Sequence, residues 1–239
     1  MPEWYEEWFG EEYLALYPHR DEEDAERLVA LLHRLIGWGP GWRVLDLCCG
    51  PGRHARALDR AGLRCVGLDL SAALLRRART VTASPLVRAD IRALPVRPRS
   101  VDVGLNLFTS FGYFDSDEEH ERTLAGMVGT VRRGGWFVLD FLNATLVRAR
   151  IPEGTGAFEG DEGGTRLRRY VTPGGGFVVK EIVLADGRRF QERVRLFDAP
   201  ALEALLARGG ATVRHRFGDY EGGPHHADAP RTLLVAAVP

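Results

Sequence analysis

One stretch of the sequence combines an acid, two glycines and the start of a helix at a spacing that suits a bound nucleoside. An apolar run ends at Asp46, Gly50 and Gly52 follow within a few residues, and a helical pattern starts at Arg53. Glycines at such a strand-to-helix turn let bare backbone approach a ligand. A second acid, Asp69, ends the next apolar run. These features together predict a ribose-containing cofactor in the N-terminal half of the chain.

The turn leaves two classes of such cofactor open, and the acids around it separate them. Residues 50–55, Gly-Pro-Gly-Arg-His-Ala, match the dinucleotide-binding pattern, with Asp69 about twenty residues further on. A carboxylate at Asp46 would repel a pyrophosphate, which prefers bare amides at a helix N-terminus, but would attract an ammonium group. Asp90 ends the third apolar run, where it can accept a hydrogen bond from an exocyclic amine. The acids favour a mononucleoside cofactor that carries an ammonium group.

Short apolar segments alternate with helical patterns around this turn, and these elements must position it. Short continuous apolar strands separated by helices form a parallel sheet that is covered on both faces. The predicted strands are 43–48, 64–69, 86–89, 101–107 and 135–141, and the predicted helices are 53–61, 71–80 and 117–132.

Different patterns flank this alternation on both sides. The first twenty residues mix aromatic and acidic residues at helical spacing, and Asp21 can cap a second helix that runs to Ile36. After Arg150, glycine-rich turns separate alternating stretches, and Asp186-Gly187 is a hairpin signal. We expect antiparallel strands at 166–171, 177–184 and 188–197, then a helix at 199–208 and strands at 211–219 and 231–238.

Composition sets bounds on partners and compartment. The 239 residues carry a formal net charge of −1, which gives no argument for nucleic acid or an anionic membrane as a partner. No apolar run approaches a membrane span, and the acidic start favours a cytoplasmic protein. Cys48, Cys49 and Cys65 fall on predicted buried strands or the turn and are expected to be reduced. Lys180 is the only lysine, so lysine-dependent chemistry would have to use a residue of the predicted antiparallel strands.

The motif Asp-Leu-Cys-Cys-Gly-Pro-Gly at 46–52, together with Phe-Thr-Ser-Phe-Gly-Tyr at 108–113, resembles the class I S-adenosylmethionine-dependent methyltransferases, in a bacterial small-molecule version. The resemblance covers about residues 43–140 by motif and the last two strands by pattern. It implies an α/β fold: a Rossmann-like, seven-stranded, mostly parallel sheet with an antiparallel last strand and helices on both faces. One domain, 1–239, would comprise an N-terminal helical lid (1–36), the cofactor core (37–149), an antiparallel β insertion (150–197) and a C-terminal part of the core (198–239).

The resemblance also implies which residues hold S-adenosylmethionine, whose product is S-adenosylhomocysteine. Asp46, Gly50 and Gly52 would surround the methionine portion. Asn106 and Leu107 would lie under its amino group and sulfonium. The family has glycine where this chain has Cys48, which predicts a tighter pocket.

The remaining implied contacts concern the adenosine portion and the carboxylate. Asp69 would accept hydrogen bonds from both ribose hydroxyls, and Leu70 would pack on the adenine. Asp90 would bind the adenine amine, while the amide of Ile91 meets the ring. We further expect Arg20, which follows the aromatic N-terminal stripe, to pair with the methionine carboxylate.

Methyl transfer from a sulfonium needs mainly alignment, and it needs a general base only if the acceptor must lose a proton. The sequence therefore demands no single catalytic residue. The candidates above the strand ends are Tyr17, His19, Tyr113 and Asn143. His225-His226 has no further ligands at metal-binding spacing, so no metal is expected.

The sequence narrows the class of methyl acceptor by excluding nucleobase amines. Methyltransferases of nucleobase amines carry Asn/Asp-Pro-Pro-aromatic after the fourth strand, and residues 106–109, Asn-Leu-Phe-Thr, match it only at Asn106. We expect a small-molecule acceptor, no nucleic-acid or membrane partner, and a monomer or a homodimer. Two alternatives stay open: an NAD(P)-dependent oxidoreductase, and a non-catalytic cofactor-binding protein on a methyltransferase scaffold.

Overall fold

The computed structural model describes residues 3–17, 22–151, 153, 158–162 and 164–239. Within them, a seven-stranded sheet has the order β10-β11-β5-β4-β1-β2-β3, and β11 runs antiparallel to both of its neighbours. This arrangement confirms the predicted fold class. The strands are β1 (Arg43–Leu47), β2 (Arg64–Asp69), β3 (Leu86–Arg88), β4 (Val101–Asn106), β5 (Val131–Leu142), β10 (Thr212–Phe217) and β11 (Arg231–Val238).

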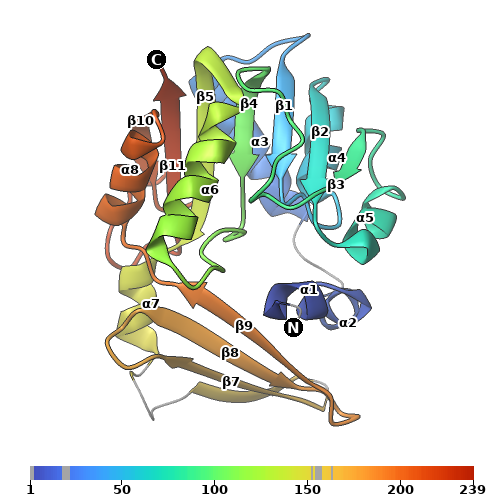
Figure 1. Ribbon diagram of the computed structural model, residues 1–239, viewed down its shortest axis with the longest axis vertical. Coiled ribbons are helices and arrows are strands. Elements are labelled where there is room, and N and C mark those ends of the chain that lie inside the picture. The colour runs from blue at the N-terminus through green and yellow to red at the C-terminus, as the bar shows by residue number, and fades with distance from the viewer. Residues whose placement is uncertain (1–2, 18–21, 152, 154–157, 163) are drawn as a thin grey trace.

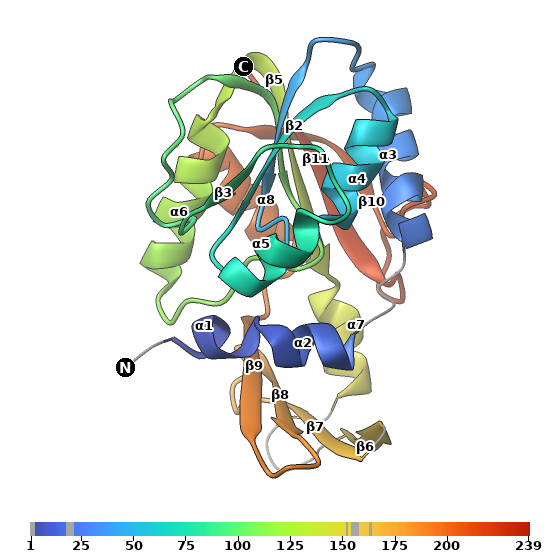
Figure 2. The same cartoon turned by 90° about the vertical axis from the view of Figure 1, so that its right-hand side faces the viewer.

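Helices cover both faces of this sheet. On one face lie α3 (Glu22–Ile36) and α4 (Arg53–Arg60), and on the other lie α6 (Asp117–Gly129) and α8 (Ala199–Arg208) (Figure 2). The short helix α5 (Ala72–Ala78) lies near the β3 edge. Capping side chains set the helix starts: Ser116 accepts from the amide of Glu119, and Asp198 accepts from the amide of Ala201. Each helix pair buries its apolar face in its own core cluster.

The region between residues 129 and 135 corrects one predicted boundary. We expected a helix to 132 and a strand from 135, because Arg133-Gly134-Gly135 is typical of the end of a helix. Instead α6 ends at Gly129 and β5 already begins at Val131, which pairs with Val101 of β4. A register shift in β4 and β5 follows that pair, so the irregular sequence is absorbed within the strand pairing.

In the part of the chain that the structure describes, a second sheet has four antiparallel strands, one more than predicted. They are β6 (Phe158–Glu162), β7 (Thr165–Val171), β8 (Phe177–Val183) and β9 (Arg189–Arg195), preceded by helix α7 (Ala144–Arg150). The additional strand β6 reads Phe-Glu-Gly-Asp-Glu, with one apolar residue and a central glycine, so it lacks the period-two signal of a strand.

The predicted N-terminal amphipathic helix is divided at Gly10 into α1 (Trp4–Trp8) and α2 (Glu11–Leu16). These helices lie between the main sheet and the second sheet (Figures 1 and 2). Trp8 and Tyr13 pack in one apolar cluster with Leu74 of α5 and with Ile182 of β8. The predicted cap of α3, Asp21, lies outside the described residues.

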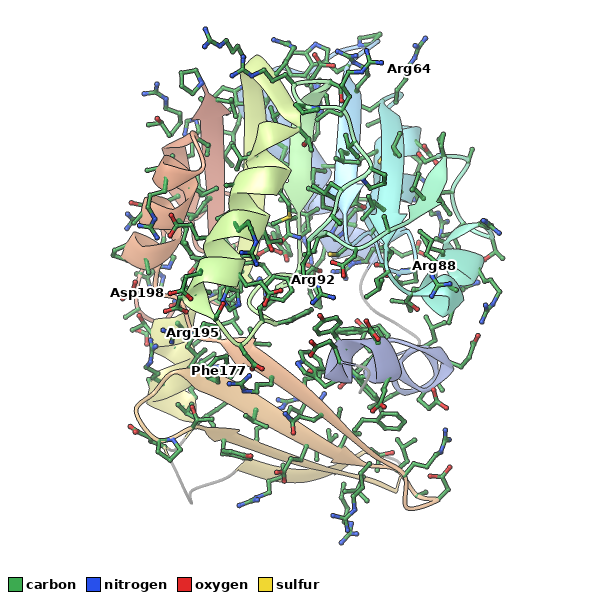
Figure 3. All side chains as sticks on the ribbon, in the orientation of Figure 1. Arg64, Arg88, Arg92, Phe177, Arg195 and Asp198 are labelled. Carbon is green, nitrogen blue, oxygen red and sulfur yellow. The ribbon has the colours of Figure 1, made fainter. Side chains whose placement is uncertain are left out.

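The second sheet and α1–α2 face the carboxyl ends of the parallel strands. Arg64 begins β2 at the far end of the molecule, whereas Arg88, the last residue of β3, lies near α1 and α2 (Figure 3). Ligands of such sheets bind beyond the carboxyl ends of the strands. No helix in the described ranges has the length and apolar character needed to cross a membrane.

Candidate cofactor and substrate site

A cavity of about 730 Å³ lies between the strand ends, α1–α2 and the second sheet. Its first wall is the main sheet, with the turn after β1 and the loops after β2, β3 and β4. Its second wall is the aromatic face of α1–α2, and its third is the inner face of β7–β9. Cavities of this size accept drug-sized ligands and cofactors. Of the predicted cofactor residues, the wall includes Cys48, Gly50, Asp69, Leu70, Asp90, Ile91 and Leu107.

The turn after β1 is held in an unusual backbone conformation. Cys48, Gly50 and Gly52 all have positive φ, at 62°, 55° and 87°. Asp69 fixes the turn, because one carboxylate oxygen accepts from the amide of Gly50 and the other accepts from the amide of Ser71, both at 2.8 Å. Each oxygen can accept a further hydrogen bond, and Asp69 lines the cavity, which suits the predicted ribose contact. Cys48, at the position where the resemblance implies a glycine, thus has a left-handed backbone.

Gly52 gives a first testable prediction, because a side chain there has neither room nor a relaxed backbone. An added Cβ would lie 2.9 Å from the Cβ of Ala78. We expect Gly52→Ala to lower the free energy of unfolding by ~3 kcal/mol through left-handed strain and overpacking. The matched control is Gly50→Ala, where nothing lies within 4 Å of the added Cβ. It should cost only ~1 kcal/mol. Equal losses in urea unfolding would contradict the steric argument.

Behind the turn lie two buried acceptors that lack partners. Asp46 is 1 % exposed, and its Oδ2 accepts no hydrogen bond from any residue that the structure describes. The Oδ1 of Asn106, at the end of the neighbouring strand, is also buried and accepts no hydrogen bond from the described residues. Burial, together with the negative charge of Asp69, raises the pKa of Asp46 to about 7, against the opposing effect of Arg53. Unsatisfied buried acceptors are costly, so this arrangement suits a cationic group with N–H donors.

Asp90 is held at the third strand end by Arg92. Its carboxylate accepts from the Arg92 amide at 2.8 Å and from the Arg92 guanidinium at 2.8 and 2.6 Å. Burial alone would raise the pKa of Asp90, but these hydrogen bonds outweigh it and lower the pKa. An ionised, oriented acceptor therefore lines the cavity, as the predicted contact to an exocyclic amine requires.

The loop after β4 is fixed by a buried ionic network that we did not predict. Asp140, fully buried, accepts from the amide of Phe108 (2.8 Å), the hydroxyl of Tyr220 (2.7 Å) and Nε of Arg231 (2.9 Å). Arg231 also donates to Oγ1 of Thr109 at 3.0 Å. Phe108 and Thr109 have φ of 57° and 62°, so the network holds two consecutive non-glycine residues in the left-handed region. An acid at a strand end, the signal that marked Asp46 and Asp69, is present at Asp140 too.

The structure separates the candidate catalytic residues. Tyr17 and Tyr113 line the cavity, and the hydroxyl of Tyr113 donates to the carbonyl of Thr109 at 2.7 Å. His19, like the predicted carboxylate partner Arg20, lies outside the described residues.

Asn143, one of the predicted candidate catalytic residues, has a structural role instead. It caps α7 by accepting from the amide of Thr145, and its amide nitrogen donates to the carbonyls of His226, Ala227 and Ala229. Its side chain is 2 % exposed and fully engaged, so it joins two loops and does not face the cavity. Within the described residues, no group of three or more His, Cys, Asp or Glu could hold a metal ion.

Comparison with known proteins addresses the identity of this cavity. Residues 44–135 match the methyltransferase domain family. The matched residues include the glycine turn, Asp69, Asp90 and the loop after β4.

Curated relatives match over part of their length. The chain is 26% identical over 176 residues to the uncharacterized protein MJ1252 of Methanocaldococcus jannaschii, which is 73% of this chain and 63% of that protein. It is 25% identical over 142 residues to the ubiquinone biosynthesis O-methyltransferase of Bordetella avium, covering 54% of this chain and 59% of the relative. The matches therefore span less than two thirds of these relatives.

Solved structures match almost the whole chain. An S-adenosylmethionine-dependent methyltransferase from Clostridium acetobutylicum superposes with a TM-score of 0.77 at 17% identity, over 95% of this chain and 98% of that one. The amino pentose methyltransferase CalS10 of Micromonospora echinaspora, solved with S-adenosylmethionine bound, gives a TM-score of 0.67 at 25% identity, over 95% and 96%. The matched residues and the elements that flank them thus share one fold with these proteins.

Proposed function

We propose that this protein transfers a methyl group from S-adenosylmethionine to a small-molecule acceptor. The observation that carries the proposal is the buried carboxylate of Asp46, whose Oδ2 has no partner among the described residues behind a glycine turn. A dinucleotide pyrophosphate would be repelled there, whereas the ammonium of a methionine moiety would be attracted. The family match of residues 44–135 supports the same cofactor.

The chain's own residues bind and orient in this proposal. S-adenosylmethionine supplies, when bound, a methyl group already activated on a sulfonium. Ionised Asp46 and the Oδ1 of Asn106 would hold the amino group, and Asp69 would accept from the ribose hydroxyls. Leu70 and Asp90 would contact the adenine, with the amide of Ile91 and with Leu107, Gly50, Gly52 and Cys48 shaping the turn. Arg20 remains our proposal for the carboxylate.

The acceptor would lie in the part of the cavity that α1–α2 and the second sheet enclose. Trp4 packs on Tyr113 with ring centroids 5.0 Å apart, and both line the cavity. This aromatic wall excludes water and aligns an acceptor, which is most of what an in-line displacement requires. Burial raises the pKa of Tyr5, so its hydroxyl stays protonated and is not a base. Tyr113 and Tyr17 remain the candidates to contact the acceptor. We propose a cytoplasmic monomer or homodimer that acts without nucleic acid.

Ligand binding tests the cofactor directly. At a concentration 100-fold above its Kd, S-adenosylhomocysteine should stabilise the protein by ~2.7 kcal/mol, because it binds only the folded state. For a chain of this size that corresponds to a rise in Tm of about 5–10 °C. NADH at the same concentration should leave Tm unchanged. A rise with NADH and none with S-adenosylhomocysteine would favour an oxidoreductase and overturn the proposal.

A further inference from the structure

The wall of the cavity opposite the glycine turn carries a row of three charged side chains. Arg169 of β7 pairs in register with Lys180 of β8, and Lys180 pairs with Glu192 of β9. Cross-strand partners share a face, with Cβ atoms about 5 Å apart. All three residues line the cavity. The row therefore crosses the inner side of the second sheet, and Figure 1 shows this sheet below α1.

Apolar rows flank the charged row on both sides. Leu167, Ile182 and Phe190 form one, and Val171, Val178 and Val194 form the other. Leu167, Ile182, Val171 and Val194 are buried, so the charges are embedded in an apolar surface. Charged groups in such surroundings carry a desolvation cost unless a partner compensates it.

The partners within the row leave one positive charge uncompensated. Glu192 accepts from Nε1 of Trp8 at 2.7 Å and lies 3.9 Å from Nζ of Lys180. Lys180 is 8 % exposed, and its ammonium lies 4.6 Å from the Tyr17 ring centroid. Arg169 makes no hydrogen bond or ion pair with any residue that the structure describes. Two cations thus face the cavity, and the row supplies a single carboxylate, which lies beside Lys180 at the end away from Arg169.

The acids elsewhere in the cavity wall do not supply the missing partner. Asp69 and Asp90 belong to the opposite wall, where backbone amides and Arg92 occupy them. Glu6 is exposed on α1. Burial lowers the pKa of Lys180, and Glu192 opposes that effect.

We propose that Arg169 and Lys180 bind an anionic group of the methyl acceptor, a carboxylate or a phosphate. The inference rests on the proposed function and adds the class of acceptor: an organic anion with an apolar or aromatic body. A guanidinium fork fits either group with two parallel hydrogen bonds. The flanking apolar rows would hold the body of the acceptor, and Glu192 would keep Lys180 in place. The anion thus orients the acceptor from the wall opposite the cofactor.

Matched probes test this with the protein loaded with S-adenosylhomocysteine. Titration calorimetry would compare phenylacetate with phenylacetamide, indole-3-acetate with indole-3-acetamide, and phenyl phosphate with phenol. We expect at least one anion to bind 10-fold or more tightly than its neutral partner. Arg169→Gln should abolish that preference. The control Arg166→Gln, an exposed arginine of the same strand on the opposite face, should retain it.

The outcomes separate this inference from the proposed function. If S-adenosylhomocysteine itself fails to bind, the proposed function fails. If it binds but no anion is preferred, or if Arg169→Gln keeps the preference, the acceptor inference is overturned. Weakened S-adenosylhomocysteine binding in Arg169→Gln would also overturn it, because the row would then hold the cofactor's own carboxylate. Preference for acids over phenyl phosphate, or the reverse, identifies the anion.

Discussion

Asp46→Asn should weaken the binding of S-adenosylhomocysteine by about 100-fold and yet stabilise the free protein above neutral pH. The first effect follows from removing the charge that pairs with an ammonium group in a buried site, which is worth several kcal/mol. The second follows because burial raises the pKa of Asp46 to about 7, so folding carries the cost of an ionised buried carboxylate at higher pH.

The pH dependence fixes the sign of both effects. A carboxyl whose pKa is raised in the folded state destabilises that state as the pH rises, and the full cost is reached once the pH exceeds the raised pKa. As the pH rises from 5.5 to 7, the free energy of unfolding of the wild type should therefore fall by ~2 kcal/mol relative to that of Asp46→Asn. Ligand binding needs ionised Asp46, so the wild-type affinity should rise about fivefold from pH 6 to pH 7. Calorimetry and urea unfolding at each pH measure both. A variant with wild-type affinity would remove Asp46 from the cofactor site.

Arg231→Met should lower the free energy of unfolding by about 4 kcal/mol. The substitution leaves Asp140 charged and fully buried without the guanidinium that now lies 2.9 Å from it. For a chain of this size the Tm should fall by about 10 °C. The loop at Phe108 and Thr109 should also loosen, because its left-handed residues depend on the same carboxylate.

Two further variants separate the ion pair from general damage. Arg214→Met replaces an exposed arginine of β10 and should change stability by less than ~0.5 kcal/mol. Arg231→Met/Asp140→Leu should recover part of the loss, because an apolar pair avoids the buried charge. The amide of Phe108 and the hydroxyl of Tyr220 still lose their acceptor, so recovery stays incomplete. A double variant as unstable as the sum of its single variants would show that the two residues act independently.

The core of the fold was predictable because its sequence signals are local. Apolar runs that end in acids gave β1 and β2, and helix 199–208 begins and ends where it was predicted. The fourth strand of the second sheet was missed, because pairing with β7 holds it in place and its own composition does not. Likewise β5 begins four residues earlier than predicted, because Val131 pairs with Val101 of β4 ahead of a stretch whose arginines and glycines suggested the end of a helix.

The candidate site was predictable in part for the same reason. Strand ends can be recognised in a sequence, so the pattern alone assigns residues such as Asp69 and Asp90 to one wall of the cavity. What a polar residue does at a strand end depends on which distant loop meets it. Asn143 meets the carbonyls of residues 226–229, and Asp140 meets Arg231, about ninety residues away in the sequence. The row on the second sheet depends on strand register, which no single segment reveals.

The chain leaves the core to form the second sheet and returns to the core at a neighbouring point. Arg148, in α7, donates to the carbonyl of Leu196, just past β9, at 3.0 Å. Every described residue that we assign to the cofactor lies outside residues 150–197, whereas Arg169, Lys180 and Glu192 lie within them. With the roles proposed above, recombination that replaces this segment between related genes would alter which molecule is methylated and leave the donor unchanged. The architecture allows the two specificities to evolve separately.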